Sequence, residues 1–186
     1  IFSPKLVTLH CGAFDFTGLV NVELNSVKNL PASFGVIYTG YFAGCTQLTH
    51  VTMKNVKKTG IKMFLNCNRL TYVDMPNLQI IKENTFQGCS LLNNITFPKV
   101  FLIEKEAFME NYGITKINFP LVTEIQNLGF YNCKNLYSIC LKNCIKLDYG
   151  SFYKCTKLSF IDLPELNHLG SYAFSSCSSL QTIIIP

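Results

Sequence analysis

Nine cysteines and three histidines are the side chains of this 186-residue chain that could bind a metal, form disulfides or act as nucleophiles. His10, His50 and His168 lie far apart, and the sequence has no Cys-x-x-Cys pair and no spaced histidine pair of the kind that binds zinc. It contains no glycine-rich phosphate loop, no His-Glu-x-x-His motif and no Ser/His/Asp or Cys/His set at converging positions. We therefore predict no catalytic residue, no metal site and no cofactor.

The cysteines belong instead to a regular 22-residue repeat. Phenylalanines recur at this step from Phe42 to Phe174, and a cysteine follows three residues after each of them except Phe108, where Asn111 stands instead. We call these six the ladder cysteines: Cys45, Cys67, Cys89, Cys133, Cys155 and Cys177. A fixed period of this length over many copies is the signature of a solenoid, in which each repeat forms one coil.

Stacked coils would place neighbouring ladder thiols one strand spacing apart with parallel Cα–Cβ bonds, which disfavours disulfides. We predict a buried ladder of free thiols, with Asn111 using its amide to satisfy backbone groups of the turn. Cys144 falls on another core position and is predicted to be buried. Cys11 and Cys140 align with polar residues of other coils and are predicted to be exposed.

Each coil has three predicted parts. A Leu-x-x-Val/Ile-x-Leu/Met/Phe segment alternates apolar and polar residues and predicts a short strand with one buried face. Proline often follows and ends the strand. An apolar pair and an x-Phe-x-x-Cys segment complete the coil as turns, short strands or a single helical turn. Stacking these coils predicts one parallel sheet with one strand per coil, in a rod or horseshoe of about eight coils.

The full pattern, seen best at Leu92 to Asn111 and Leu158 to Cys177, resembles the BspA-like, or Treponema pallidum-type, leucine-rich repeats. The sequence departs from it at Lys54 and Lys142, where proline is missing, and at Asn111. The resemblance implies a leucine-rich-repeat solenoid with its strands on the concave face. It also implies a surface or secreted protein of bacteria or of some protists, in a family with members implicated in adhesion to host or matrix proteins.

The repeat predicts one domain over residues 1–186, with irregular coils over 1–41 and regular coils over 42–186. The interval from Leu19 to Phe42 is seven residues longer than in later coils, which predicts an insertion near 28–35. Neither end shows the polar cap that a terminal repeat needs, so we interpret the chain as a fragment of a longer protein.

The outward side chains of the predicted strands form rows with one residue per coil, and we predict that they bind a partner. Tyr72 and Phe160 are large aromatics in these rows; they are either interface hot spots or ordinary scattered surface aromatics. The predicted binding residues are His50, Thr52, Tyr72, Asp74, Asn94, Thr96, Lys116, Asn118, Ser138, Cys140, Phe160 and Asp162.

Composition narrows the function further. The net charge of +5 is mild and acids are interspersed among the lysines, which indicates a solvated surface and no nucleic-acid partner. No uninterrupted apolar run is long enough to cross a bilayer, so no membrane insertion is predicted.

We predict a non-catalytic, protein-binding module of a cell-surface or secreted protein, with a host or matrix protein as partner. The alternative is an intracellular scaffold or targeting module of a larger cytoplasmic protein, since free thiols suit a reducing compartment. The oligomeric state is left open.

Overall fold

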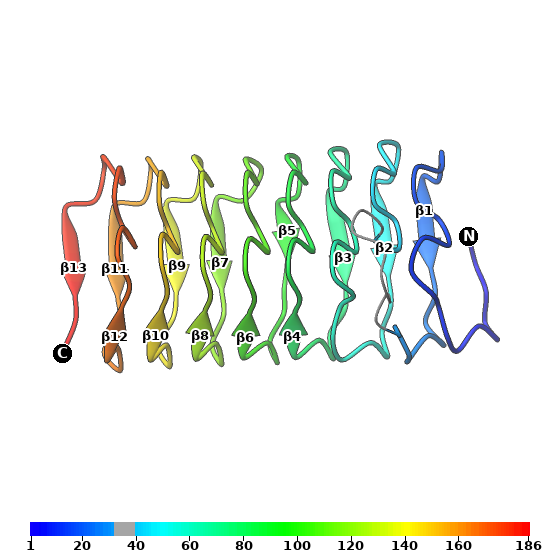
Figure 1. Ribbon diagram of the computed structural model, residues 1–186, viewed down its shortest axis with the longest axis horizontal. Coiled ribbons are helices and arrows are strands. Elements are labelled where there is room, and N and C mark those ends of the chain that lie inside the picture. Colours follow the sequence, from blue (N-terminus) through cyan, green and yellow to red (C-terminus); the bar gives the residue numbers. More distant parts are fainter. Residues whose placement is uncertain (32–39) are drawn as a thin grey trace.

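The chain forms a stack of coils whose two termini lie at opposite ends of the long axis (Figure 1). The computed structural model describes residues 1–31 and 40–186. In these residues eight short strands, one per coil, lie along one side: β1 (Asn21–Glu23), β2 (His50–Thr52), β3 (Tyr72–Asp74), β5 (Asn94–Ile95), β7 (Lys116–Asn118), β9 (Ser138–Cys140), β11 (Phe160–Asp162) and β13 (Thr182–Ile184). We call their outward surface the strand face.

A second row of two-residue strands lies across the coils from the first. These are β4 (Ile80–Ile81), β6 (Leu102–Ile103), β8 (Glu124–Ile125), β10 (Lys146–Leu147) and β12 (His168–Leu169), which pair side by side in one parallel sheet. We call it the second sheet. The described residues contain no helix. Of the alternatives predicted for the rest of each coil, turns and short strands are therefore the ones that form, and the single helical turn does not.

Strand register follows the sequence period. Partners on neighbouring strands are separated by the 22-residue step, as for His50 with Tyr72 and Lys116 with Ser138. The first pairing differs, because Asn21 of β1 pairs with His50 of β2, which is a longer interval. Much of the insertion predicted near 28–35 falls on residues 32–39, which lie outside the described residues.

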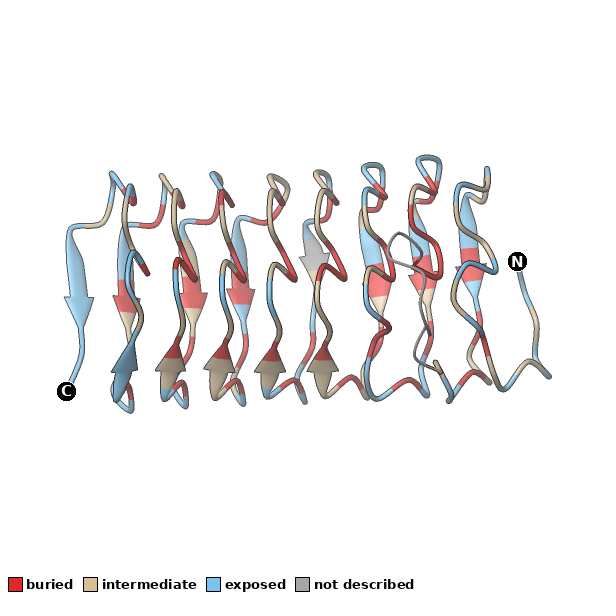
Figure 2. Cartoon of the chain, viewed as in Figure 1, coloured by how far each residue is buried: buried red, intermediate tan, exposed pale blue. Residues whose placement is uncertain are grey.

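The core is a column of stacked phenylalanines enclosed by the two rows of strands. Ring centroids of successive members lie 4.9–5.6 Å apart from Phe14 to Phe174, with interplanar angles of 2–18°. The members from Phe42 to Phe152 are fully buried. Figure 2 shows the buried residues recurring along the coils. Each coil therefore buries its apolar side chains against its neighbours, as expected of a solenoid.

The ladder cysteines are free and buried, as predicted, and each makes the same hydrogen bond. Its Sγ donates to the carbonyl oxygen of a phenylalanine on the preceding coil, at 3.0–3.1 Å. The prediction for Asn111 is wrong: its side chain is fully buried, yet among the described residues neither Nδ2 nor Oδ1 has a hydrogen-bond partner. A planar amide at this position does not reproduce the single S–H donor of its neighbours.

The turn around each phenylalanine contains left-handed residues that the sequence did not reveal. Residues two before and two after the phenylalanine have φ of 53–62° in non-glycine cases such as Glu106 and Glu110, which flank Phe108. Such a conformation is uncommon outside glycine. It turns the backbone so that its amides bond the adjoining coil, as Phe108 N does to Gly129 O at 2.8 Å. Backbone bonding between coils thus decides this geometry, whatever the side chain.

Thiol reactivity follows from this burial. Seven cysteines are buried, whereas Cys11 and Cys140 are half-buried, so both are less exposed than predicted. Burial raises the pKa of the Cys144 thiol to about 11 and that of Cys177 to about 12, so both stay protonated and unreactive at pH 8. We expect iodoacetamide at that pH to modify only Cys11 and Cys140 in the native protein, and all nine cysteines in denaturant. Mass spectrometry of the alkylated peptides checks this, and rapid native labelling of a ladder cysteine would contradict it.

Candidate functional site

The strand face presents one to two outward side chains per coil on a regular backbone frame. In β2, β3 and β11 the central residue is buried and its neighbours point outward, because side chains alternate along a strand. The structure thus places the predicted residues of these strands in two rows parallel to the long axis. Tyr72 and Phe160 expose 38% and 47% of their surface, which is high for large apolar side chains.

The N-terminal half of the strand face contains an aromatic pair. The rings of His50 and Tyr72 lie on neighbouring strands with centroids 5.8 Å apart and tilted by 40°. His50 Nδ1 also lies 2.9 Å from the Thr49 hydroxyl, which fixes the ring's orientation. This arrangement offers a partner a preformed, partly apolar contact with a polar edge.

The C-terminal half of the strand face contains the second aromatic and an ion pair. Phe160 lies on β11, and Asp162 of the same strand accepts a 2.7 Å hydrogen bond from Lys142 Nζ. That hydrogen bond raises the pKa of Lys142. Phe160 lies four coils from Tyr72, about 19 Å at the usual strand spacing, so the two aromatics form separate contact points. The structure therefore does not gather the predicted residues into one pocket.

The second sheet has a different electrostatic character, since most of its charged side chains pair with one another. Lys82 contacts Glu104 at 2.6 Å, and Lys146 contacts both Glu124 and Asp148 at 3.2 Å. On the strand face, Asp74 and Lys116 have no ion-pair partner among the residues that the structure describes. Asp74 and Lys116, unlike Asp162, are therefore available to bind another molecule.

Sequence reasoning missed a tyrosine–lysine cluster on the turns of the C-terminal coils. Lys154 Nζ lies 5.4 and 5.2 Å from the ring centroids of Tyr131 and Tyr153, and 3.1 Å from the Tyr131 hydroxyl. Tyr172 packs near Tyr153 and exposes 62% of its surface. The 22-residue step from Tyr131 to Tyr153 was the available signal. The cluster satisfies its lysine internally, so we interpret it as surface packing of adjacent coils.

Neither a metal-binding cluster nor a membrane-spanning helix is found in the described parts of the chain. Over residues 1–31 and 40–186, no three His, Cys, Asp or Glu side chains are placed to hold one metal ion. In the same residues no helix is long and apolar enough to cross a bilayer.

The stacked coils, parallel strands and 22-residue register define a leucine-rich-repeat solenoid. The chain belongs to the family described as the BspA type leucine rich repeat region, whose pattern matches residues 10–137 and 79–186 in six copies. The resemblance predicted from the sequence, and the fold that it implied, are thus confirmed. No curated protein matches the chain significantly.

Two solved structures of bacterial proteins have the same fold. A leucine-rich repeat protein from Bacteroides ovatus has a TM-score of 0.71 and 23% identity over 100% of this chain and 47% of its own length. A leucine rich cell surface protein from Faecalibacterium prausnitzii has a TM-score of 0.72 and 20% identity over 100% of this chain and 52% of its own length. The chain thus spans about half the length of these two proteins, and at such identity the likeness shows the fold alone.

Proposed function

We propose that this chain is a non-catalytic, protein-binding module of a cell-surface or secreted protein, and that the strand face holds the partner. The proposed contact residues are His50, Thr52, Tyr72, Asp74, Asn94, Thr96, Lys116, Asn118, Ser138, Cys140, Phe160 and Asp162. Family membership and the F. prausnitzii protein, described as a cell surface protein, support the proposed location. Adhesion to a host or matrix protein is the role we propose for this binding.

The observation that carries the proposal is the contrast between the two sides of the coils. The second sheet pairs most of its charges internally, whereas the strand face exposes Tyr72, Phe160 and charged side chains that are unpaired within the described residues. Interfaces favour exposed aromatic anchors surrounded by polar groups. A row of such groups spread over many coils suits a protein surface better than a small molecule, which needs its contacts gathered in one pocket.

The test measures binding to an array of extracellular-matrix and epithelial-surface proteins. We expect Tyr72→Ala and Phe160→Ala each to weaken binding of the captured protein about fivefold to thirtyfold, the range for a hot spot of about 1–2 kcal/mol. Phe101→Ala is the matched control, because Phe101 is also an exposed phenylalanine (42%) but precedes β6 of the second sheet.

Circular dichroism should show all three variants folded, since each removes an exposed side chain. Equal loss of affinity in the Phe101 variant, or none in the other two, would reject the strand face as the contact surface. A full-length protein that stays in the cytoplasm would favour the alternative role of intracellular scaffold.

A further inference from the structure

The strand face and the turns that flank it carry one set of four side chains twice. Each member of the second set follows its counterpart in the first by four 22-residue steps. Both sets comprise a lysine, a second cation, a six-membered aromatic ring and an aspartate, and we call them the paired sets. The first set is Lys54, Arg69, Tyr72 and Asp74, and the second is Lys142, Lys157, Phe160 and Asp162.

The structure places the two sets alike on their coils. Each aromatic ring is the exposed first residue of its strand, Tyr72 in β3 and Phe160 in β11, and each aspartate is the last residue of the same strand. Lys142 of the preceding coil donates to Asp162 at 2.7 Å, whereas Lys54 forms no ion pair within the described residues. Both lysines stand where the proline of the repeat pattern is missing. The paired sets thus consist partly of departures from the repeat.

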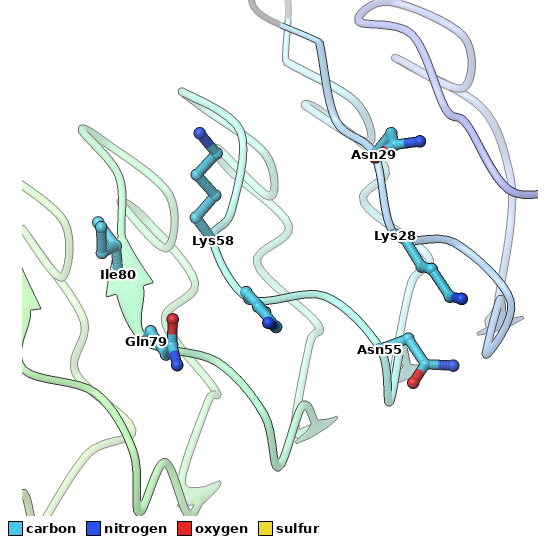
Figure 3. Close-up of a pocket in the computed structure, with 7 residues that line it drawn as sticks. Lys28, Asn29, Asn55, Lys58, Gln79 and Ile80 are labelled. Carbon is cyan, nitrogen blue, oxygen red and sulfur yellow. The ribbon is translucent and has the colours of Figure 1, made fainter.

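This correspondence does not extend to every outward position. Thr52 of the strand face corresponds to Cys140 four coils further on. A groove of about 610 Å³ beside β4 of the second sheet is lined by lysines, amides and Ile80, with no aromatic ring in its described lining (Figure 3). Lys57 of that groove corresponds to Ile145 four coils further on. The duplication is therefore not a general property of the coils, which indicates a shared role for the paired sets.

The two rings of the paired sets form equivalent contact points about 19 Å apart, four strand spacings along the long axis. A partner that contacts both rings must offer the same group twice, at this separation and facing in the same direction. At the same position the three coils between the rings hold polar residues: Asn94, Lys116 and Ser138.

We propose that the strand face binds a proline-rich segment in the polyproline II conformation, with one proline on Tyr72 and another on Phe160. This inference rests on the proposed function, because it names the class of partner for the same surface. A polyproline II helix has three residues per turn and rises about 3.1 Å per residue, so residues six apart lie about 18.6 Å apart and face the same way. Proline-rich segments dock on aromatic side chains, and their preformed conformation lowers the entropy lost on binding.

Other regular conformations match the two rings less well. Thirteen residues of an α-helix span about 19.5 Å, but the turn of 3.6 residues brings the two ends to different faces. A β-strand of six residues has about the right length, yet it needs backbone partners. The backbone of β3 already pairs with β2 and β5, so the strand face offers such a strand side chains alone. A polyproline II helix needs no backbone partner, because its own backbone stays solvated.

The probes are acetylated nonaproline, about 28 Å long, and acetylated tetraproline, about 12 Å long, of which only the first can reach both rings. Chemical-shift titration of the ¹⁵N-labelled protein measures both affinities. We expect nonaproline to bind at least about thirtyfold more tightly than tetraproline, because its second contact is intramolecular. Tyr72→Ala and Phe160→Ala should each reduce this gain to about fivefold or less, the part that multiple registers of a uniform peptide leave.

Two controls separate ring stacking on the strand face from other effects. Tyr72→Phe should keep the full gain, because the second set already uses phenylalanine at this position. Phe101→Ala, which removes an exposed ring beside the second sheet, should also keep it. A nine-residue Gly/Ser peptide, which has no fixed conformation, should not bind.

Three results would overturn the proposal: absence of nonaproline binding up to about 10 mM, a length gain that survives both alanine variants, or an equal loss of gain in the Phe101 variant. Competition against a protein captured from the surface-protein array separates this inference from the proposed function. Captured protein that depends on Tyr72 and Phe160 and is displaced by nonaproline supports both. Captured protein that depends on the two rings but resists nonaproline would retain the strand face as the contact surface and reject a proline-rich partner.

Discussion

Replacing Phe130 with alanine should lower the free energy of unfolding by about 3–5 kcal/mol, the usual loss for a buried phenylalanine. Phe130 is fully buried between Phe108 and Phe152, with ring centroids 4.9 and 5.3 Å away and nearly parallel planes. The rings on both sides would lose a stacking partner, and the stacked coils leave few side chains able to fill the cavity. Urea denaturation followed by circular dichroism measures this change.

Because the fold is a solenoid, we also predict where along the chain the Phe130→Ala change loosens the structure. Because each coil contacts only its neighbours, amide exchange in the Phe130 variant should accelerate most in the adjoining coils and least near Phe42. Phe130→Leu, which keeps most of the volume, should cost about 1–2 kcal/mol and keeps the test available if the alanine variant fails to fold. The exposed Phe101→Ala change should cost less than about 0.5 kcal/mol, and an equal cost at both sites would contradict the stacked core.

Replacing Asn111 with cysteine should raise stability by about 1–3 kcal/mol, because two buried polar atoms without partners would be removed. The new thiol would donate to the carbonyl oxygen of Phe86, which stands at the same offset from it as Phe108 does from Cys133. The reverse change, Cys133→Asn, should lose a comparable amount.

Thermal and urea unfolding of both variants test this prediction. Asn111→Ala is the control that removes the amide without adding a donor, and it should gain less than the cysteine variant because it leaves a cavity. A destabilised Asn111→Cys protein would show that the amide contributes to stability by a contact other than those described.

Much of this structure could be predicted from the sequence repeat, for identifiable reasons. A strict 22-residue step forces like residues to stack, so the pairing of His50 with Tyr72 and the burial of Cys144 could both be predicted. The left-handed residues could not, because Leu128 and Lys154 share no side-chain property and their φ is imposed by bonding between coils. Asn111 was mistaken because sequence position reveals burial but not whether an amide finds partners there.

The candidate surfaces were predictable to different degrees. Alternation along each strand placed Tyr72 and Phe160 outside, since the period of a strand is two. The packing of Tyr41 over Gly60 had no such signal, because neither residue has a counterpart of the same type in the neighbouring coils. The packing features that distinguish this protein from other repeat proteins therefore arise where its sequence departs from the repeat pattern.

The most direct test of strand-face binding uses the two thiols expected to react in the native protein. Cys140 lies on the strand face in β9, whereas Cys11 precedes β1 and lies outside it, so the pair provides a site and its internal control. Alkylation rates are measured by mass spectrometry with and without a saturating protein captured from the surface-protein array. We predict that the bound protein slows alkylation of Cys140 at least about tenfold and leaves Cys11 unchanged. Unchanged labelling of Cys140, with or without protection of Cys11, would contradict binding through the strand face.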